Sequence, residues 1–402
     1  MIIPMSQRMM RRAFEKVRYR YAEVPPPPSG GNFSIYVHVP FCRTKCPFCP
    51  FYKELFSEQL KREYLEAINK EIKKADLQGQ TRWIYFGGGT PNTLTVDDIN
   101  GIVSALRQKV SADSIGIELL PASLTREYLE GLKGIGVTKI SLGVESLSED
   151  VLGQAGRKAV PYEEIKAMIE AAQSMDLWVN TDIMVGLKGQ TPAVFLDDIQ
   201  KMAALHPHQV TTYPLMVMRG QKYKSFIPPH EQFELIEEAG DILADHGYGR
   251  NSVWIFSLGN DVYDSSGDEL VEDYLGFGPG AFSTYGNWKV VNPPLDIYLD
   301  NLKNGSQMGF VAPKSKPANI MRRFAKMIYD LRCSDMADFP LPVKIYVKIL
   351  KLAGYSQNGI LTPKGVIFAH AITKTVVEAL PMPIQNPSCV ENWDDIPISG
   401  EK

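Results

Sequence analysis

Three of the chain's five cysteines, Cys42, Cys46 and Cys49, lie within eight residues of one another. Cysteine sulfur is the ligand that holds iron–sulfur clusters, and a four-iron cluster takes a full set of four cysteines. Three cysteines leave one iron without a protein ligand, and an open coordination site distinguishes a catalytic metal centre from a structural one. The spacing therefore predicts a [4Fe–4S] cluster with one iron free to bind another molecule.

A structural zinc ion and a disulfide are the alternatives for the same cysteines. Zinc would need a fourth Cys or His at ligand spacing, and none follows Cys49. His38 is the nearest candidate, but it belongs to the run of strand-forming residues before the cluster. We recognise no secretory signal, so we expect a reducing, cytoplasmic environment in which disulfides do not persist. We interpret the two remaining cysteines, Cys333 and Cys389, as bystanders.

Hydrophobic periodicity predicts an alternation of strands and helices after the first 33 residues. Strand patterns lie at residues 35–39, 83–86, 115–119, 139–143, 178–185 and 209–213, and helical patterns lie at residues 60–72, 124–132, 162–175, 191–204 and 229–244. This order indicates a parallel sheet with crossover helices. We expect an α/β fold whose six strand–helix units, (β/α)6, form an open, partial TIM barrel.

Polar residues and glycines gather where these strands end. The cysteines follow the first strand, Gly87–Gly89 follow the second, Glu118 ends the third, and Glu145 lies just past the fourth. Asp182 lies inside the fifth strand among apolar residues, where a charge needs a partner or a ligand. Because parallel sheets bind ligands at the carboxyl ends of their strands, the pattern predicts a site at that end of the sheet.

The spacing Cys-x3-Cys-x2-Cys, with Phe48 before the third cysteine, resembles the radical S-adenosylmethionine (SAM) enzymes. The flanking Tyr36–Phe41 stretch and the Phe86–Asn92 stretch, which reads FGGGTPN, resemble the oxygen-independent coproporphyrinogen III oxidase-like family of that superfamily. The resemblance covers roughly residues 34–380. It implies that SAM chelates the open iron through its amino and carboxylate groups, and that reduction then releases a 5′-deoxyadenosyl radical.

Matched residue by residue, the resemblance also implies which residues touch SAM. The implied contacts are Tyr36, Phe48, Gly88, Gly89, Thr90, Glu118, Glu145, Arg157 and Asp182. A guanidinium such as that of Arg157 can hold a methionine carboxylate by two parallel hydrogen bonds. Many family members have Gln where this chain has Glu145, which places a carboxylate near the cationic sulfonium. The segment Phe277–Ser283, and Phe282 within it, resembles the return segment that contacts a second SAM molecule in this family.

We expect four regions along the chain. Residues 1–33 form a basic, proline-rich arm, residues 34–310 form the barrel with the return segment, residues 311–381 form a helical lid with a β-hairpin wing, and residues 382–402 form an irregular tail. The arm is either a solvated segment or a cover whose arginines pair with an anionic substrate.

The composition sets limits on the partners. A net charge of −3 gives no global field that would attract nucleic acid. No apolar run is long enough to span a bilayer, so we expect a cytoplasmic protein without a membrane span.

Methyl transfer is the function that we favour from the sequence. The class C radical SAM methyltransferases resemble this chain in the barrel, and they use a second SAM to methylate an sp2 carbon of a planar substrate such as a porphyrin. Oxidative decarboxylation of the coproporphyrinogen III dehydrogenase type is the alternative, although the arm lacks that enzyme's Pro-Arg-Tyr-Thr-Ser-Tyr-Pro-like stretch. Either reaction implies an electron donor such as flavodoxin or ferredoxin.

A heme-binding chaperone is the third candidate and belongs to a different functional class. The stretch around Asn251 aligns with the chaperone's His-Asn-x-x-Tyr-Trp stretch, but Arg250 stands in the place of the His. The missing imidazole argues against heme ligation at this position. All three candidates imply a planar or tetrapyrrole-like small molecule.

Overall fold

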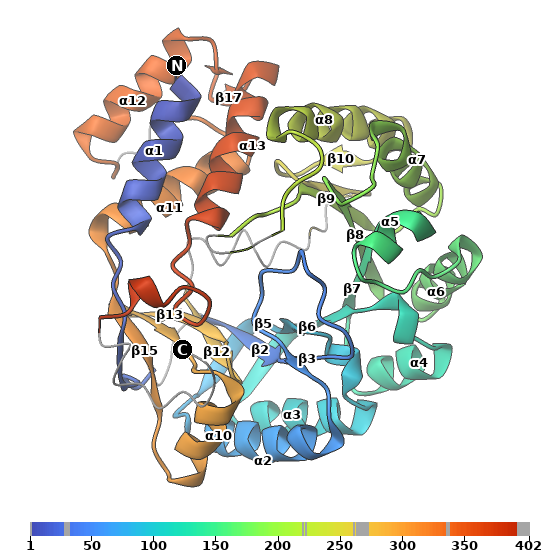
Figure 1. Ribbon diagram of the computed structural model, residues 1–402, viewed down its shortest axis with the longest axis vertical. Coiled ribbons are helices and arrows are strands. Elements are labelled where there is room, and N and C mark those ends of the chain that lie inside the picture. The colour runs from blue at the N-terminus through green and yellow to red at the C-terminus, as the bar shows by residue number, and fades with distance from the viewer. Residues whose placement is uncertain are drawn as a thin grey trace. The chain divides into compact units, whose positions relative to one another are not determined.

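The helices and strands of the computed structural model follow the alternation that the sequence predicts (Figure 1). The structure describes residues 2–27, 33–218, 221, 223–259, 262, 273–334 and 338–391. These residues form two compact units, each assembled from three stretches of chain. Unit 1 consists of Met1–Lys16, Asp182–Val271 and Ser315–Leu380, and unit 2 consists of Val17–Thr181, Glu272–Lys314 and Pro381–Lys402.

Parallel strands form the centre of unit 2. Their order is β2 (Phe33–Val39), β5 (Gly79–Gly88), β6 (Val110–Leu119) and β7 (Lys139–Glu145), and each neighbouring pair is parallel. Inward-facing residues such as Ile35, Ile84 and Ile117 are fully buried. Since the strands are parallel, their carboxyl ends at residues 39, 88, 119 and 145 lie along one edge of the sheet.

An antiparallel extension continues this sheet beyond β2, and the sequence did not predict it. The strand β12 (Tyr274–Phe277) pairs in parallel with β2, and the next strands in order are β13 (Phe282–Tyr285), β14 (Trp288–Val291), β15 (Met308–Pro313) and β1 (Arg20–Glu23), all antiparallel to their neighbours. The register aligns Gly276 with Tyr36. The return segment therefore begins beside the strand that leads to the cysteines.

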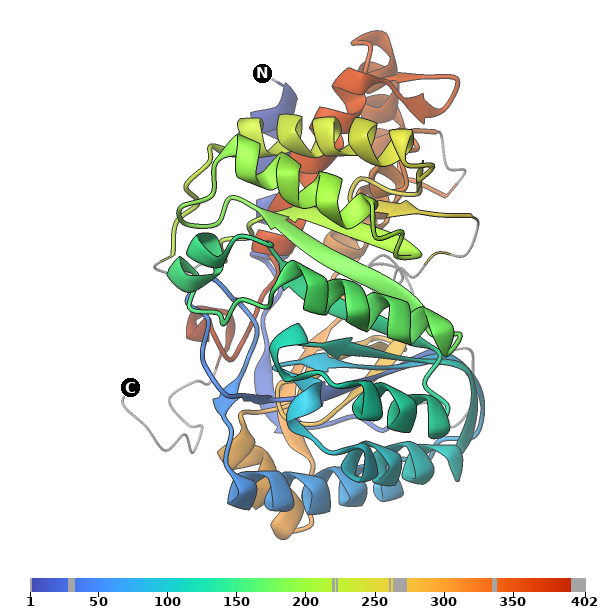
Figure 2. The same ribbon diagram turned by 90° about the vertical axis from the view of Figure 1, so that its right-hand side faces the viewer.

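Helices in unit 2 follow the strands, and several begin at side-chain caps. They are α2 (Glu58–Lys74), α3 (Val96–Arg107), α4 (Arg126–Gly134), α5 (Glu149–Gln154), α6 (Tyr162–Ser174) and α10 (Leu295–Lys303), with 3-10 turns η1 (Pro91–Thr93), η2 (Pro121–Ser123) and η3 (Pro387–Cys389). Thr95 and Asp98 form a reciprocal capping box at the start of α3, a helix that the sequence analysis missed. Figure 2 shows α2 and α3 together below the strands.

Unit 1 continues the alternation. Its strand order is β8 (Trp178–Val185, of which residues 182–185 belong to this unit), β9 (Gln209–Pro214), β11 (Ile255–Ser257) and β10 (Gly249–Arg250), with helices α7 (Pro192–Ala203) and α8 (Pro229–Asp245). With β2, β5, β6 and β7, the strands β8 and β9 correspond to the six strands predicted from the sequence. The predicted α/β class is therefore confirmed, in a mixed sheet.

A group of helices completes unit 1. It contains α1 (Ile2–Phe14), α11 (Lys316–Tyr329), α12 (Leu341–Leu352) and α13 (Pro363–Glu378), with a short hairpin of β16 (Ser356–Gln357) and β17 (Ile360–Leu361). The predicted C-terminal helices and hairpin are observed, in one unit with residues 1–16 and 182–271, and the division of the chain into four regions stays a prediction. The basic N-terminal segment contributes a packed helix, because Met10 and Phe14 of α1 are fully buried.

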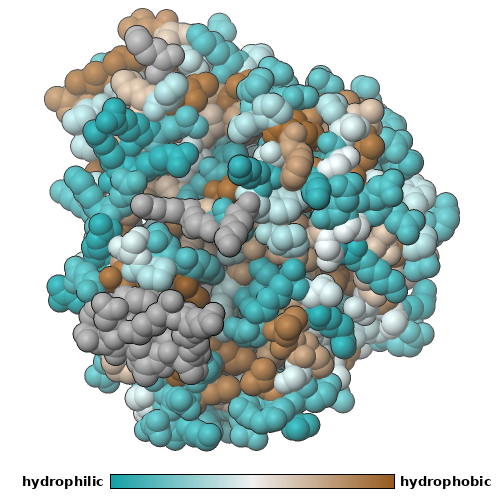
Figure 3. Space-filling model, viewed as in Figure 1, coloured by the Kyte–Doolittle hydropathy of each residue, from teal (hydrophilic) through white to brown (hydrophobic). Residues whose placement is uncertain are grey.

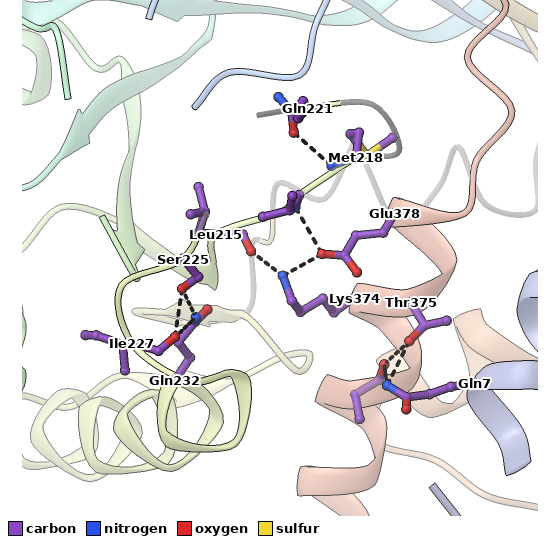
Figure 4. Close-up of polar contacts among 12 residues, drawn as sticks. Gln7, Leu215, Met218, Gln221, Ser225, Ile227, Gln232, Lys374, Thr375 and Glu378 are labelled. Carbon is purple, nitrogen blue, oxygen red and sulfur yellow. Dashed lines mark hydrogen bonds and ion pairs between the residues drawn. The ribbon is translucent and has the colours of Figure 1, made fainter. Parts of the chain in front are cut away.

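Polar contacts join α13 to the segment that follows β9 (Figure 4). The Lys374 ammonium donates to the Leu215 carbonyl and forms an ion pair with Glu378 at 2.8 Å. The Val217 amide donates to Glu378 Oε1 at 3.0 Å. On the other side of α13, Gln7 Nε2 donates to Thr375 Oγ1 at 3.0 Å. The N-terminal helix and this loop are therefore each joined to α13 by side-chain hydrogen bonds.

Candidate active site

The cysteine loop is closed at its base by two short strands in unit 2. The strands β3 (Phe41–Cys42) and β4 (Glu54–Leu55) pair with each other, and the Phe56 amide donates to the Cys42 carbonyl at 3.0 Å. Lys53 Nζ donates to the Cys49 carbonyl at 2.8 Å, and the Cys49 amide donates to the Cys46 carbonyl at 3.2 Å. These bonds fix both ends of the loop while its middle carries two of the three thiols.

The three thiols differ in exposure but interact electrostatically. Cys42 is buried, whereas Cys46 and Cys49 are partly exposed. Burial raises the pKa of the Cys42 thiol, and the charges of Cys49 and Cys46 raise it further. Thr90 Oγ1 lies 3.4 Å from Cys42 Sγ. Among the described residues no three Cys, His, Asp or Glu side chains converge in a metal-binding arrangement.

The chemistry of these donors nevertheless fits a cluster. All three sulfurs belong to one loop, two of them are partly exposed, and cysteine sulfur is the ligand that iron–sulfur clusters take. The ligand roles of Cys42, Cys46 and Cys49 remain a prediction.

The glycine run at the end of β5 packs against the backbone before the cysteines. A Cβ on Gly89 would lie 2.6 Å from the Phe41 carbonyl oxygen, and Gly88 has a φ of +109° above the His38 ring. The Gly89 and Thr90 amides donate to Val39 and Phe41 at 2.7 Å. These two bonds and the close approach of Gly89 to the Phe41 backbone fix the glycine run against the start of the cysteine loop.

His38 lies beneath this run and is completely enclosed. Its Nε2 lies 3.1 Å from the Tyr52 carbonyl oxygen, which can only accept, so Nε2 carries the proton. Nδ1 is then the acceptor for the Tyr36 hydroxyl at 3.1 Å. Both ring nitrogens are engaged, which agrees with the rejection of His38 as a zinc ligand and shows that it orients Tyr36.

We expect His38 to make the protein sensitive to acid. Burial lowers its pKa to about 4, from 6.5 in the unfolded chain. A depressed histidine pKa means that stability is complete above pH 6.5 and falls as the pH drops toward 4. By pH 4 the loss from this group is about 3 kcal/mol in the free energy of unfolding. Urea unfolding of the wild-type protein across this range measures the slope.

His38→Gln is the matched control for this prediction. Glutamine retains an N–H donor for the Tyr52 carbonyl and has no group that titrates in this range. The variant should therefore lose markedly less stability between pH 6.5 and pH 4 than the wild-type protein. Equal slopes in the two proteins would show that His38 is not the titrating group.

Glu118 occupies the carboxyl end of β6, as predicted. The Tyr85 hydroxyl donates to its Oε1 at 2.9 Å, and the Gly88 amide lies 3.4 Å from its Oε2. Burial raises the pKa of Glu118 and nearby Glu145 raises it further, while the two hydrogen bonds lower it. Glu118 is half-buried, and its carboxyl group can accept further hydrogen bonds from a bound ligand.

Glu145 and Arg157 form an ion pair at the end of β7. Glu145 has a φ of +65°, a left-handed conformation that is uncommon outside glycine and is often found at functional sites. Arg157 NH1 lies 3.3 Å from Glu145 Oε1 and donates to the Gly143 carbonyl at 3.0 Å. The guanidinium also lies 5.3 Å from the centre of the Phe48 ring. Three predicted residues, Glu145, Arg157 and Phe48, are thereby brought together.

The last two predicted site residues belong to other strands. Asp182 lies in β8 of unit 1 and is half-buried. Phe282 opens β13 in the antiparallel extension of unit 2 and is half-buried too. The SAM-binding roles of Asp182 and Phe282 remain a prediction.

A buried carboxylate that the sequence analysis missed holds the return segment in place. Glu71 of α2 accepts hydrogen bonds from the Gly278 amide at 2.8 Å, from Asn292 at 2.8 Å and from the Tyr298 hydroxyl at 2.6 Å. Burial raises its pKa, and these three bonds oppose that rise. Glu71 therefore fixes the turn that precedes Phe282. A charged residue on the apolar face of the 60–72 helical pattern was the available signal.

The sequence of this chain is similar to those of known radical SAM proteins. The model of the radical SAM superfamily matches residues 36–202. The heme chaperone HemW of Bacillus subtilis is 30% identical over 290 residues, which cover 66% of this chain and 75% of the relative. The chain belongs to the oxygen-independent coproporphyrinogen III oxidase-like family of radical SAM proteins.

Further relatives of this radical SAM protein support the same assignment. The oxygen-independent coproporphyrinogen III oxidase of Escherichia coli is 27% identical over 333 residues, which cover 75% of this chain and 68% of the relative. The solved structure of coproporphyrinogen III oxidase (HemN) from Escherichia coli has a TM-score of 0.73 at 21% identity, covering 89% of this chain and 96% of that one. The structural likeness confirms the fold.

Membership of the radical SAM superfamily implies a [4Fe–4S] cluster and SAM as cofactors. It does not set the number of SAM molecules, and the relatives reported above give no support to methyl transfer. Among the described helices, none is both long enough and apolar enough to cross a lipid bilayer.

Proposed function

We propose that this chain cleaves SAM reductively at a [4Fe–4S] cluster bound by Cys42, Cys46 and Cys49 and oxidises a planar, tetrapyrrole-like substrate. The observation that carries the proposal is the position of the cysteine loop at the carboxyl end of β2, with the Arg157–Glu145 pair at the carboxyl end of β7 in the same unit. The cluster and SAM together supply a 5′-deoxyadenosyl radical when bound. The residues of the chain supply binding, orientation and exclusion of water.

Charge complementarity supports the assignment of SAM contacts. SAM carries a carboxylate, an amino group, a sulfonium and ribose hydroxyls. The guanidinium of Arg157 suits the carboxylate, and the carbonyl groups of Gly88 and Gly89 suit the amino group. The carboxyl oxygens of Glu118 and Glu145 suit the hydroxyl donors of SAM. Thr90, through its contact with Cys42, would position the loop.

The sequence alone favoured methyl transfer, whereas we now favour oxidation of the substrate. Curated relatives carry the names of a coproporphyrinogen oxidase and a heme chaperone, and both names refer to tetrapyrroles. Methyl transfer would also need a second SAM, for which the segment around Phe282 is the candidate. Glu71 accepts a hydrogen bond from the Gly278 amide and so fixes the turn before Phe282. A fixed turn suits a role of this segment in ligand binding, but the turn does not identify the ligand.

The chaperone is the second candidate, because several relatives carry that name. Arg250, which replaces the chaperone's His, forms two hydrogen bonds to Glu237 at 2.7 and 2.8 Å. His370 also bonds Glu237 at 2.8 Å and accepts from the Trp254 indole at 3.0 Å. Side chains committed to one another in this way are poor axial ligands, so we favour the enzyme.

Anaerobic reconstitution tests the proposal. The protein would be loaded with iron and sulfide, mixed with SAM and a flavodoxin or ferredoxin donor, and incubated with coproporphyrinogen III and related porphyrins. We expect 5′-deoxyadenosine together with loss of CO2 from the substrate in mass spectra. A gain of one methyl group in the product, together with formation of S-adenosylhomocysteine, would instead identify the reaction as methyl transfer and overturn the proposed oxidation. Stoichiometric heme retention without 5′-deoxyadenosine would favour the chaperone and overturn the proposal.

A further inference from the structure

The helix α12 exposes a stripe of aliphatic side chains to solvent. Leu341 is 68% exposed, Ile345 is 49%, Ile349 is 43% and Leu352 is 90% exposed. At 100° per residue these four positions share one face of the helix. The opposite face carries Val343, Tyr346, Val347 and Leu350, which are buried against the rest of unit 1. Figure 3 shows this hydrophobic surface over α12 at the upper left.

Lysines accompany the stripe along one edge. Lys344, Lys348 and Lys351 lie on α12 between the exposed and the buried faces. The chain has no Asp or Glu from residue 339 to residue 377. Residues 2–16 and 315–380, which contain the four packed helices, carry fourteen Lys and Arg against five Asp and Glu, although the whole chain has a net charge of −3. Residues 2–16 and 315–380 are therefore strongly basic although the net charge of the whole chain is small.

The kinds of side chain on this face suit a lipid surface better than a protein partner. Protein interfaces are enriched in aromatic residues and arginine and depleted in lysine at their centre. The exposed face of α12 has aliphatic residues and lysines, with its single aromatic residue, Tyr346, buried. Lysine stems can extend along apolar surface while the ammonium reaches a charged headgroup. Interfacial helices combine these same two features.

We propose that α12 docks this protein reversibly on anionic lipid bilayers. The stripe Leu341, Ile345, Ile349 and Leu352 enters the headgroup boundary, and Lys344, Lys348 and Lys351 contact phosphate groups. Exposed Ile360 on the neighbouring hairpin adds apolar surface to the same group of helices. Docking of this kind involves no membrane-spanning segment.

Vesicle flotation with the full-length protein tests the proposal. The probes are vesicles of phosphatidylcholine alone and vesicles of phosphatidylcholine mixed with phosphatidylglycerol, at low and at high salt. We expect flotation with the mixed vesicles only, and less of it at high salt because screening weakens the attraction. Lys344→Glu/Lys348→Glu should weaken binding by at least about thirtyfold. Ile345→Ser/Ile349→Ser should weaken binding by about tenfold or more.

Lys70→Glu/Lys73→Glu is the matched control, because these exposed lysines of α2, in unit 2, give the same change in charge on a different helix. This variant should float like the wild-type protein. Absence of flotation, or an equal loss in the control, would overturn the proposal. A protein partner in place of lipid would also overturn the proposal. That result would be a wild-type protein that does not bind vesicles, together with α12 variants that no longer bind an acidic protein which the wild type binds. The readout does not depend on cluster loading or activity.

Discussion

Replacing any one of Cys42, Cys46 or Cys49 with alanine should abolish SAM cleavage while leaving a folded protein. A cluster held by three cysteines cannot lose one and keep the same open iron. Cys46 and Cys49 are partly exposed, so shortening them removes little packing. The measurement is 5′-deoxyadenosine formation after anaerobic reconstitution, together with iron and sulfide content and urea unfolding. We expect complete loss of product, and for Cys46→Ala and Cys49→Ala an unfolding free energy within about 1 kcal/mol of the wild type.

Cys333→Ala provides the opposite pattern as a control. Its side chain is fully buried, so the substitution should cost about 1 kcal/mol of stability through the lost packing. Iron content and SAM cleavage should be unchanged. If a variant lacking all three loop cysteines still formed 5′-deoxyadenosine, the cysteines would not hold the cluster. If Cys333→Ala alone removed the cluster, the ligand set would need revision.

The parts of the fold that follow from local pattern were predictable. The fifth strand was predicted at 178–185 and is observed as Trp178–Val185. Most of its side chains are buried, and its content of β-branched and aromatic residues is a local property of the sequence. The helix α3 was missed although Thr95-x-x-Asp98 is a capping-box signal followed by Ile99, Ile102 and Val103. The signal for this helix is therefore present in the local sequence.

The antiparallel extension was beyond local reasoning. The strand β1 pairs with β15, and Tyr21 aligns with Phe310 almost 300 positions away in the sequence. Strands of four residues such as β12 and β13 carry too few residues for a clear period. Their identity as strands depends on partners that only the folded chain supplies.

The candidate site shows the same division between motif and environment. The positions of Glu118 and Glu145 at strand ends were predictable, because strand boundaries follow from pattern. The proton on His38 Nε2 and the hydrogen bonds to Glu71 were not, because they depend on carbonyl and amide groups from distant segments. A sequence motif therefore locates the ligands of a site more readily than the residues that orient them.

Arg157→Ala should weaken SAM binding strongly while changing the fold little. Hydrogen bonds between charged groups contribute about 1.5–3 kcal/mol, so the loss of a carboxylate contact corresponds to a Kd roughly 10 to 100 times higher. The variant also leaves Glu145 enclosed without its partner at 3.3 Å. Titration of SAM into the reconstituted protein measures the affinity, and urea unfolding measures the stability.

Two further variants separate ligand binding from the internal ion pair. Glu145→Gln removes the charge that Arg157 compensates and introduces the residue that the resemblance gives to many family members, so SAM affinity should stay within about twofold. If Arg157 acts on SAM, Arg157→Ala should weaken binding by a similar factor in the Glu145→Gln background. If it acts only through Glu145, the effect should vanish there, because double-mutant cycles report such coupling. Arg126→Ala, which removes an exposed arginine of α4, should leave affinity unchanged. Wild-type affinity in Arg157→Ala itself would remove this residue from the site.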